Sequence, residues 1–360
     1  MWPYWLLFFV PAFQAVSKLK QVPPLWQEKS WSSVWRIIFV LLSLMIGLRH
    51  EVGGDWANYL LNIEATSDAT LSEALAGTRG DPADNFFNWI ASKSGLGIYL
   101  MNGVYGTMFT FGLLVFCRNQ PRPWLALAVA VPYLITVVAM GYSRQGVAIG
   151  LIMLGLVALE KKSVLKFIAF VTLAALFHKS AVILMPLAVL ARTKSWVLTF
   201  FLLTATTLLL FILLLQEHVD TLIANYVVAE YESSGAAIRV TMNALPAALF
   251  LLMRKRFLLS PAQRSFWTWI ALGALAFVVL LYVSAASTAI DRVALYFIPL
   301  QLFVWSRMPD VMGRPGAANA GWVYAVLVYC AAVYFVWLFF ANYSTYWLPY
   351  KFYPWVWLWH

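Results

Sequence analysis

The chain has 360 residues, of which 62% are hydrophobic and only 11% are charged, and its mean hydropathy is +0.77. Soluble domains contain about 45–50% apolar and about 25% charged residues, so this composition excludes an ordinary soluble domain and indicates a polytopic membrane protein. The net charge of +10 does not require a nucleic-acid partner, because membrane proteins collect Lys and Arg on their cytoplasmic side.

Twelve apolar runs are candidates for membrane helices, which need roughly 20 mostly apolar residues. We expect them, in chain order, at residues 2–17, 34–48, 97–116, 124–140, 145–159, 164–177, 181–190, 196–215, 240–253, 266–283, 293–305 and 322–341. The first run has no basic flank and no cleavage site after it, so we expect a retained helix and not a signal peptide. Several runs are short, and the pair around His178 could instead form one bent helix with a re-entrant tip.

The charges alternate between the loops that these helices define. One set of loops holds seventeen of the 25 basic residues and three of the 15 acidic residues, and the other set holds the rest. This asymmetry supports the helix count and places the basic face in the cytoplasm. Two long loops, 50–96 and 216–239, then lie on the outer face, and residues 1–360 form one transmembrane domain. We expect short surface helices in the first loop.

Two aromatic or apolar stretches on the outer face have more than one interpretation. In the second long loop, apolar residues at 222, 223, 226 and 227 have helical spacing, which suits either an amphipathic helix or a solvated connector. The C-terminal stretch 346–360 is dense in Trp and Tyr. These residues favour the membrane–water interface, so we expect an interfacial belt there in preference to a sugar-stacking platform.

The stretch 49–59 places several charges where the second apolar run ends. It contains Arg49, His50, Glu51 and Asp55, together with two adjacent glycines. Charges at the mouth of a membrane helix are costly unless they meet a partner or a ligand, and glycines let the backbone approach another group closely. The stretch therefore indicates either a binding site or a helix end with interfacial charges.

Further basic groups lie at other outer helix ends. With the first stretch, they make the set Arg49, His50, Arg144, His178, Lys179, Arg239 and Arg292. A bundle can bring such ends to one rim, where arginine forks match the oxygens of a multiply charged anion such as a diphosphate. Each position alone has a simpler explanation, since a single Arg can snorkel to the interface and a single His can satisfy a carbonyl.

Several common catalytic motifs do not occur in the sequence. There is no Asp-x-Asp on a loop, no His-Glu-x-x-His and no phosphate-binding P-loop. A nucleotide- and metal-dependent transferase or an ATP-driven pump is therefore not supported. An activated donor, such as a lipid-linked diphosphate sugar, fits better, because cationic groups stabilise the leaving diphosphate and His, Asp or Glu can act as the base.

Five segments resemble motifs of the EpsG/Wzy-like polysaccharide polymerases. The first is Arg49-x-x-Val-Gly-Gly-Asp55-Trp-x-Asn-Tyr59, which resembles their Arg-x-x-x-Gly-Thr-Asp-Tyr-x-x-Tyr signature. The others are Asp81-Pro82-Ala-Asp-Asn-Phe-Phe, Ser143-Arg144-Gln145-Gly-Val-Ala, Leu176-Phe177-His178-Lys179-Ser180-Ala181 and Asp291-Arg292-Val-Ala-Leu-Tyr296. The resemblance covers residues 36–306, and the chain departs from the family pattern at Gly54, Trp56 and Asp81.

This resemblance implies an all-α, GT-C-like integral membrane glycosyltransferase of the bacterial inner membrane. Such an enzyme joins undecaprenyl-diphosphate-linked oligosaccharide repeat units into a surface polysaccharide on the periplasmic side, without a metal or other cofactor. Its expected partners are the lipid-linked donor and acceptor, the bilayer, and candidate accessory proteins such as a chain-length regulator and a flippase. No nucleic acid is expected.

The residues of the five segments receive expected roles. The catalytic candidates are His178, Asp55 and Arg49; the diphosphate-binding candidates are Arg144, Arg239 and Arg292; the substrate-binding candidates are Tyr59, Gln145, Asp291 and Tyr296. His178 is the first candidate for a general base or an acceptor-orienting group, because an apolar helix end favours a neutral imidazole. It could instead only cap the helix break, and Asp55 could instead orient Arg49.

Other activities predict different features. A glycan ligase would use the same donor and differ only in its acceptor, so the sequence separates it poorly from a polymerase. A lipid-linked oligosaccharide flippase predicts charges along the whole membrane path and an inverted repeat, whereas the charges here gather at helix ends. An acyltransferase built on His178 would take its acyl donor from the cytoplasm, which is the wrong side for this residue.

Overall fold

The computed structural model describes residues 1–19, 31–77, 80–187, 201, 204–205, 235–284 and 287–358. Apart from one isolated bridge between Arg49 and Phe352, these residues form helices and turns and contain no strand. Within them, six helices are long and apolar enough to cross a membrane: α6 (Gly97–Arg118), α8 (Ser143–Glu160), α13 (Ala236–Met253), α14 (Pro261–Val283), α18 (Ala320–Phe340) and the continuous run Ser287–Trp305. Their length and composition indicate a membrane protein.

The remaining apolar helices are shorter. They are α1 (Trp2–Ser17), α2 (Ser33–Gly47), α9 (Val164–Phe177) and the run Pro123–Ala139, which begins as α7 (Pro123–Ala130). Helices thus occupy ten of the twelve expected places, and six of them meet the length and composition of a span. The count of twelve membrane spans is not confirmed. The expected helix at 196–215 and the expected amphipathic stretch at 222–227 lie outside the described residues.

Two expected helices have a different form from the one predicted. The run 124–140 changes at Val131 from α-helix to a π-helix over Val131–Ala139, where Pro132 cannot donate a backbone N–H. The expected α-helix at 181–190 begins instead as a 3-10 helix, η3 (Lys179–Leu184). It is separated from α9 by His178, whose backbone is extended. The chain is therefore bent at His178, and residues 188–190 of the expected second helix lie outside the described residues.

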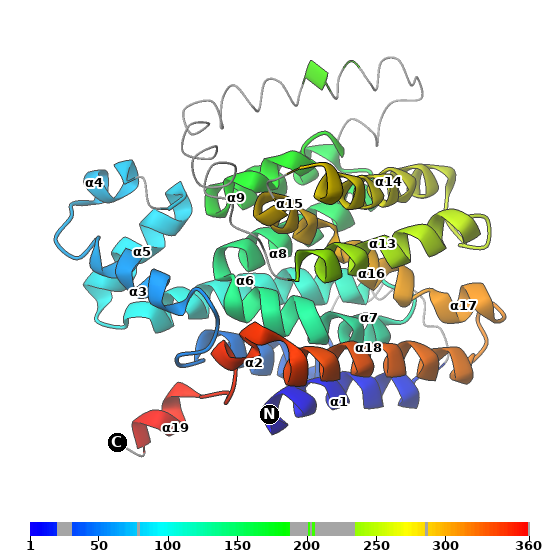
Figure 1. Cartoon of the computed structure of the whole chain (residues 1–360), viewed down its shortest axis with the longest axis horizontal. Coiled ribbons are helices and arrows are strands. Elements are labelled where there is room, and N and C mark those ends of the chain that lie inside the picture. The colour runs from blue at the N-terminus through cyan, green and yellow to red at the C-terminus, as the bar shows by residue number, and fades with distance from the viewer. Residues whose placement is uncertain are drawn as a thin grey trace.

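The long helices run side by side, and a small helical layer lies beyond one end of them (Figure 1). That layer consists of α3 (Trp56–Glu64), α4 (Leu71–Ala76) and α5 (Pro82–Ser94), as expected for the first long loop. α4 starts with a capping box between Thr70 and Glu73, and α5 starts with a proline at its first turn, which favours helix initiation. Short polar sequences thus suffice to define this layer.

Glycines bring three central helices close together. A Cβ atom on Gly112 of α6 would lie 2.0 Å from the carbonyl oxygen of Gly150 in α8, and one on Gly47 of α2 would lie 2.8 Å from the Cα of Gly103 in α6. Small residues at helix crossings allow such close packing in membrane proteins. The order α2–α6–α8 is therefore fixed at its centre, and the outer ends of these helices are held in register.

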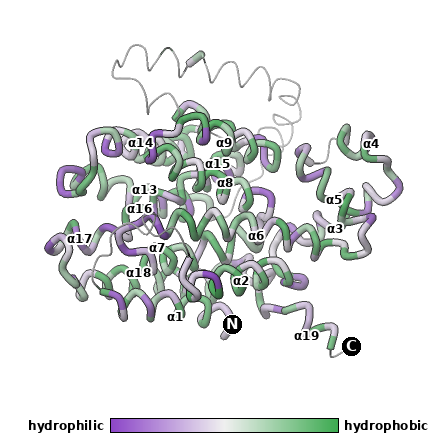
Figure 2. The backbone as a smooth tube through the Cα atoms, turned by 180° about the vertical axis from the view of Figure 1, so that it is seen from behind, coloured by the Kyte–Doolittle hydropathy of each residue, from purple (hydrophilic) through white to green (hydrophobic). Residues whose placement is uncertain are grey.

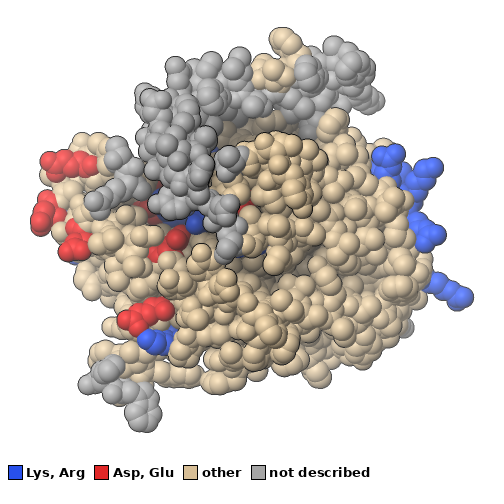
Figure 3. Space-filling model, viewed as in Figure 1, with Lys and Arg blue, Asp and Glu red and all other residues tan. Residues whose placement is uncertain are grey.

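The two ends of the bundle carry opposite charge. Acidic side chains gather at the end that holds α3–α5, and basic side chains gather at the opposite end (Figure 3). The exposed basic group that follows α13 consists of Arg254, Lys255 and Arg256. Hydrophilic residues likewise concentrate at the turns between helices, while the helix interiors are hydrophobic (Figure 2). This separation agrees with the alternation of charge between successive loops in the sequence.

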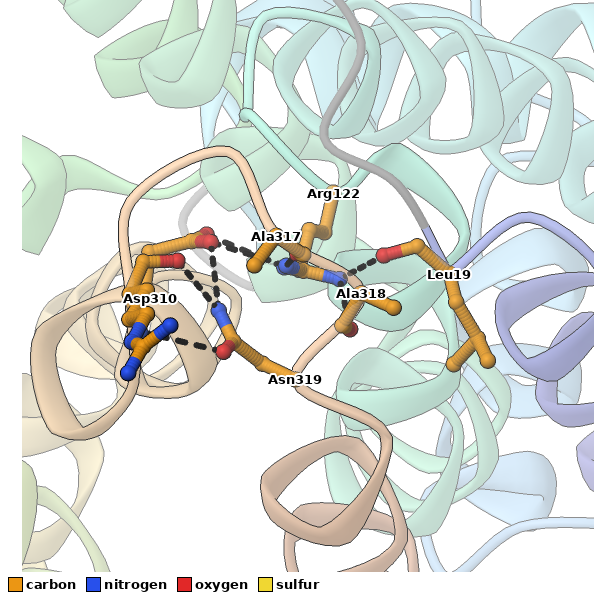
Figure 4. A network of polar contacts seen from close by, with 7 residues as sticks. Leu19, Arg122, Asp310, Ala317, Ala318 and Asn319 are labelled. Carbon is orange, nitrogen blue, oxygen red and sulfur yellow. Dashed lines mark hydrogen bonds and ion pairs between the residues drawn. The ribbon is translucent and has the colours of Figure 1, made fainter.

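The basic end is held together by Arg122, at the start of α7. Its Nε and Nη2 donate to the two carboxylate oxygens of Asp310 at 3.0 and 2.8 Å. Its remaining N–H groups reach the carbonyl oxygens of Leu19, Ala317 and Ala318 (Figure 4). One buried guanidinium thus joins the chain after α1 to the chain before α18. A paired, fully hydrogen-bonded charge of this kind is tolerated in the interior.

The aromatic C-terminal stretch is partly a core element. Trp347 is only 2% exposed, and its Nε1 donates to the Thr136 carbonyl at 2.8 Å. The Tyr4 hydroxyl donates in turn to the Trp347 carbonyl at 2.6 Å. A Cβ on Gly141 would lie 2.1 Å from the indole ring. The prediction of an interfacial belt is therefore wrong for Trp347, because this side chain fills the space that a glycine leaves.

The charge separation predicts the orientation of the chain in the membrane. The variant Asp68→Cys, in the exposed loop before α4, should react with a membrane-impermeant thiol reagent added to the outer side. The variant Lys162→Cys, in the exposed turn after α8, should react only after the membrane is opened. Labelling of Lys162→Cys in closed cells, with Asp68→Cys protected, would reverse the assigned orientation.

Candidate functional site

A cluster of opposite charges lies where helix ends at the acidic end of the bundle meet α5. Its ion pairs are Arg144 with Asp84, Lys179 with Asp81, Arg239 with Asp291 and Arg292 with Asp55. These residues come from six well-separated parts of the chain, so the bundle does bring these helix ends together, as the sequence predicted. We call these eight residues the charge cluster.

Arg144, in the first turn of α8, faces a buried carboxylate. Its Nη1 lies 3.7 Å from Asp84 Oδ2. Asp84 is fully buried and accepts hydrogen bonds from the Tyr105 hydroxyl at 2.8 Å and from Asn88 Nδ2 at 3.1 Å. The carboxylate is thus held by α5 and α6, and it sets the position of the guanidinium. At 3.7 Å the contact with Arg144 is an ion pair and is too long for a hydrogen bond.

Arg292 lies against an aromatic ring and a second carboxylate. Its guanidinium carbon is 4.1 Å from the centre of the Tyr142 ring, a cation–π contact, and its Nη1 is 3.9 Å from Asp55 Oδ2. The amide of Gln145 donates to the backbone carbonyl of Arg292. Gln145 is buried, and its Oε1 has no hydrogen-bond partner among the described residues. Gln145 thus positions the Arg292 backbone and keeps one acceptor unused.

Arg239 and Asp291 form the tightest pair of the cluster. Arg239 Nε and Nη2 donate to the two oxygens of Asp291 at 2.7 and 2.6 Å, in the parallel fork geometry of a strong bidentate pair. The pair ties the start of α13 to α15 (Ser287–Ala294). Asp291 therefore pairs with Arg239 and not with its neighbour in sequence. The Arg239 guanidinium, which was expected to bind a diphosphate, binds the Asp291 carboxylate in this structure.

His178 lies at the break between α9 and η3 and belongs to a hydrogen-bonded chain. Its Nδ1 is 2.7 Å from Ser180 Oγ, which is 3.1 Å from the hydroxyl of Tyr296. Within the described part of the chain, no partner lies within hydrogen-bond distance of its Nε2, and this nitrogen is the one that can meet a substrate. Lys179, the next residue, lies 3.9 Å from Asp81 Oδ1.

The environment moves the pKa values of two groups in opposite directions. Burial raises the pKa of Asp81 to about 6, although Arg144 and Lys179 oppose this shift. Burial, and then the positive charges of Arg144 and Arg292, lower the pKa of His178 to about 3. Desolvation disfavours the charged form of each group, which explains both directions. Near neutral pH, His178 is a neutral imidazole as expected, but it is a weak base, whereas Asp81 titrates close to neutrality.

Arg49 lies beneath the cluster and not in it. It is 1% exposed, and it donates from Nε to the Val52 carbonyl at 3.1 Å and from Nη1 to the Ile46 carbonyl at 2.5 Å. Its Nη2 donates to Asn102 Oδ1 at 2.9 Å and to Ser143 Oγ at 2.6 Å. These contacts occupy the guanidinium with protein acceptors. The geometry therefore favours a structural role for Arg49 over the expected catalytic one.

The sequence named most members of the cluster and missed two. Arg144, Arg239, Arg292, Asp55 and Asp291 lie in it, Tyr296 reaches it through Ser180, and Tyr59 is buried beside it. Asp81 and Asp84 received no role, although their spacing of three residues at a helix start places them on one face. In the part of the chain that the structure describes, no group of three or more His, Cys, Asp or Glu side chains could hold a metal ion. The aspartates of the cluster face cations instead.

Comparison with known proteins gives one match. The model of a family described as the EpsG family matches residues 33–352, which is most of the chain. The expected resemblance is thereby confirmed, and the match extends beyond the segments that suggested it. No curated protein and no solved structure matches the chain.

Replacing Arg49 tests its structural role. Arg49→Met removes four hydrogen bonds to buried acceptors; Asn102 Oδ1 and Ser143 Oγ keep their bond to each other at 3.3 Å, and each group that is left unsatisfied costs about 1–3 kcal/mol. We expect a destabilisation of about 2–4 kcal/mol, measured as a lower midpoint of thermal unfolding in detergent. Arg254→Met, at an exposed position of the basic end, is the matched control and should unfold like the wild type. An Arg49→Met protein with normal stability but no activity would restore the expected catalytic role.

Proposed function

Because the chain belongs to the EpsG family, we propose that it is a membrane glycosyltransferase that polymerises a polysaccharide. Its donor and acceptor are oligosaccharide repeat units linked through a diphosphate to an undecaprenyl carrier. The reaction takes place on the outer, periplasmic side of the bacterial inner membrane, where the charge cluster lies if the basic end is cytoplasmic. A flippase that delivers the units and a regulator of chain length are the accessory proteins that such a reaction needs.

The observation that carries this proposal is the unequal strength of the pairs in the charge cluster. The contacts of Arg144, Arg292 and Lys179 with their carboxylates measure 3.7–3.9 Å, whereas charge-assisted hydrogen bonds are about 2.7–2.9 Å. A diphosphate can make shorter contacts than these carboxylates do. It would therefore compete well with the carboxylates that face Arg144, Arg292 and Lys179, and poorly with Asp291, whose bidentate contacts with Arg239 are already short.

The reaction that fits this site is a displacement at the anomeric carbon of the donor. The acceptor hydroxyl oxygen forms a bond to that carbon, and the bond from the carbon to the diphosphate oxygen breaks. The diphosphate leaves with the electron pair, and Arg144, Arg292 and Lys179 stabilise the charge that it gains. The hydroxyl proton passes to a carboxylate of the cluster, for which Asp81 is the first candidate.

His178 and Asp55 keep roles beside Asp81. With its Nδ1 on Ser180, His178 can present Nε2 to the acceptor hydroxyl and orient it. Asp55 opposes Arg292 at 3.9 Å, so it either fixes that guanidinium or takes the proton in place of Asp81. Burial raises the pKa of Asp55 as well. Tyr296 positions His178 through Ser180, and Gln145 positions the backbone of Arg292. Both therefore act on the substrate indirectly.

The decisive experiment adds purified lipid-linked repeat units to the protein in detergent. A ladder of products that grows by one repeat unit per step is the expected result, because the same molecule serves as donor and acceptor. Transfer of a single unit to another acceptor, with no ladder, would indicate a ligase. Absence of any transfer by protein that is folded and saturated with substrate would contradict the proposal.

Arginine substitutions test the diphosphate contacts. Arg144→Ala and Arg292→Ala each remove a charge-assisted contact worth about 1.5–3 kcal/mol, so ladder formation should slow roughly tenfold to a hundredfold. The lysine variants keep the charge without the planar fork and should fall between alanine and wild type. Arg254→Ala, remote from the site, should have no effect. A wild-type rate in either alanine variant would remove that arginine from the site.

The pH dependence of the rate separates the candidate bases. A base with a pKa near that of Asp81, about 6, is charged above that pH, so the wild-type rate should fall as the pH drops through this value. Asp81→Asn should be slow and should lose this acid limb, whereas His178→Gln should keep it, since the pKa of His178 lies near 3. Loss of the limb in Asp55→Asn, and not in Asp81→Asn, would assign the proton to Asp55.

A further inference from the structure

A second recess of the protein lies outside the charge cluster, among α1, α2, α7 and the C-terminal stretch. It has a volume of about 300 Å³. Its walls include Leu6 and Val10 of α1, Leu41 and Met45 of α2, and Tyr350 and Phe352 of the C-terminal stretch. The recess follows α1 from Trp2 to Pro11, a length of about 14 Å at 1.5 Å per residue. This is close to half of the roughly 30 Å hydrocarbon core.

The chemistry of the recess suits a hydrocarbon chain. Every residue that lines it is apolar or aromatic, and the Tyr350 hydroxyl is already donated to the Met45 carbonyl at 2.8 Å. Water finds no hydrogen-bond partner on such walls. Leu6 and Leu41 at its opening are 55% and 51% exposed, so the recess opens toward the surroundings of the bundle. On an apolar helix surface those surroundings are lipid, and a lipid chain can enter from the side.

The recess and the charge cluster share one structural element, the stretch 347–352. The C-terminal end of this stretch contributes Tyr350 and Phe352 to the wall of the recess. Trp347, at its start, lies edge-on to Tyr142 with ring centres 6.4 Å apart. Tyr142 is the ring that carries Arg292 at 4.1 Å. Two aromatic side chains therefore separate the apolar recess from a cation of the charge cluster.

The stretch 347–352 is held firmly in this position. His50 N donates to the Lys351 carbonyl at 2.9 Å, and Tyr353 N donates to the Leu48 carbonyl at 2.8 Å. The C-terminal stretch thus pairs with the chain that leaves α2, which also carries Asp55 toward Arg292. The recess and the charge cluster therefore have a fixed relation to each other through this stretch.

We infer that the recess binds the isoprenoid chain of the lipid-linked donor, while the diphosphate of the same molecule binds Arg144 and Arg292. This inference rests on the proposed function for the identity of the lipid. An anionic head beside an uncharged, membrane-open recess matches an isoprenoid diphosphate in both parts. The recess takes only the chain segment nearest the diphosphate, because its length is about that of one leaflet. The remainder of the chain stays in the bilayer.

Kinetics with two donors test the inference. Val10→Trp narrows the recess from its lipid-exposed edge, and Val328→Trp places the same side chain on an exposed face of α18 as the control. We expect Val10→Trp to raise KM roughly tenfold for a full-length isoprenoid donor, equivalent to about 1.4 kcal/mol. With a donor on a very short carrier, KM should stay unchanged, as should kcat with both donors. An equal change for both donors, or no change, would overturn the inference.

Photo-crosslinking gives a test that does not require activity. Leu41, at the edge of the recess, is replaced by p-benzoylphenylalanine, and the protein is irradiated in vesicles of phosphatidylglycerol that contain undecaprenyl diphosphate. A crosslink to undecaprenyl diphosphate, reduced by excess unlabelled isoprenoid diphosphate, is expected at this position and not at Val328. Capture of phosphatidylglycerol alone would overturn the inference even if polymer forms. If the specific crosslink forms but the protein makes no polymer, the recess still binds an isoprenoid diphosphate and the proposed function is rejected.

Discussion

The arrangement of the outer end depends on one buried cation, the guanidinium of Arg49. Among the described residues no carboxylate forms an ion pair with it, and it is held by neutral acceptors from three helices and a loop. Neutral partners leave a net charge inside the protein, and its burial is tolerated because the guanidinium donates four hydrogen bonds to them. One of these acceptors is Ser143, which precedes Arg144. The buried arginine therefore determines where α8 begins, and so where the charge cluster stands relative to α2 and α6.

The charge cluster contains one short ion pair and several longer ones. Arg239 and Asp291 are locked in a bidentate contact and join two helices, whereas the pairs around Arg144 and Arg292 are looser and partly accessible. With four cations and four carboxylates, the site is close to neutral before an anion arrives. Keeping the cations paired lowers the cost of burying them in the absence of substrate. In the proposed reaction, replacement of these long contacts by short ones would favour a diphosphate.

Much of this could be predicted from the sequence, because helices, charge asymmetry and site motifs are local patterns. Apolar runs located most helices, and basic groups at helix ends identified Arg144 and Arg292. The roles of single residues could not be read in the same way. Arg49 follows one apolar run and Arg144 precedes another, so the sequence gives them similar surroundings. The packing of α2 against α6 determines that Arg49 is the one that is buried. Trp347 had the composition of an interfacial aromatic, but the glycine that receives it lies about two hundred residues earlier in the chain.

The contact between Tyr4 and Trp347 joins residues 343 positions apart, and this has a consequence for how the protein is made. Ribosomes add roughly 5–20 residues per second, so α1 must wait in the bilayer for tens of seconds before its partner is synthesised. During that interval the recess has no C-terminal wall, and the chain that leaves α2 lacks its hydrogen-bond partners at Lys351 and Tyr353. This part of the fold therefore stays incomplete until residues 347–352 have been synthesised and have reached α1 and the chain after α2.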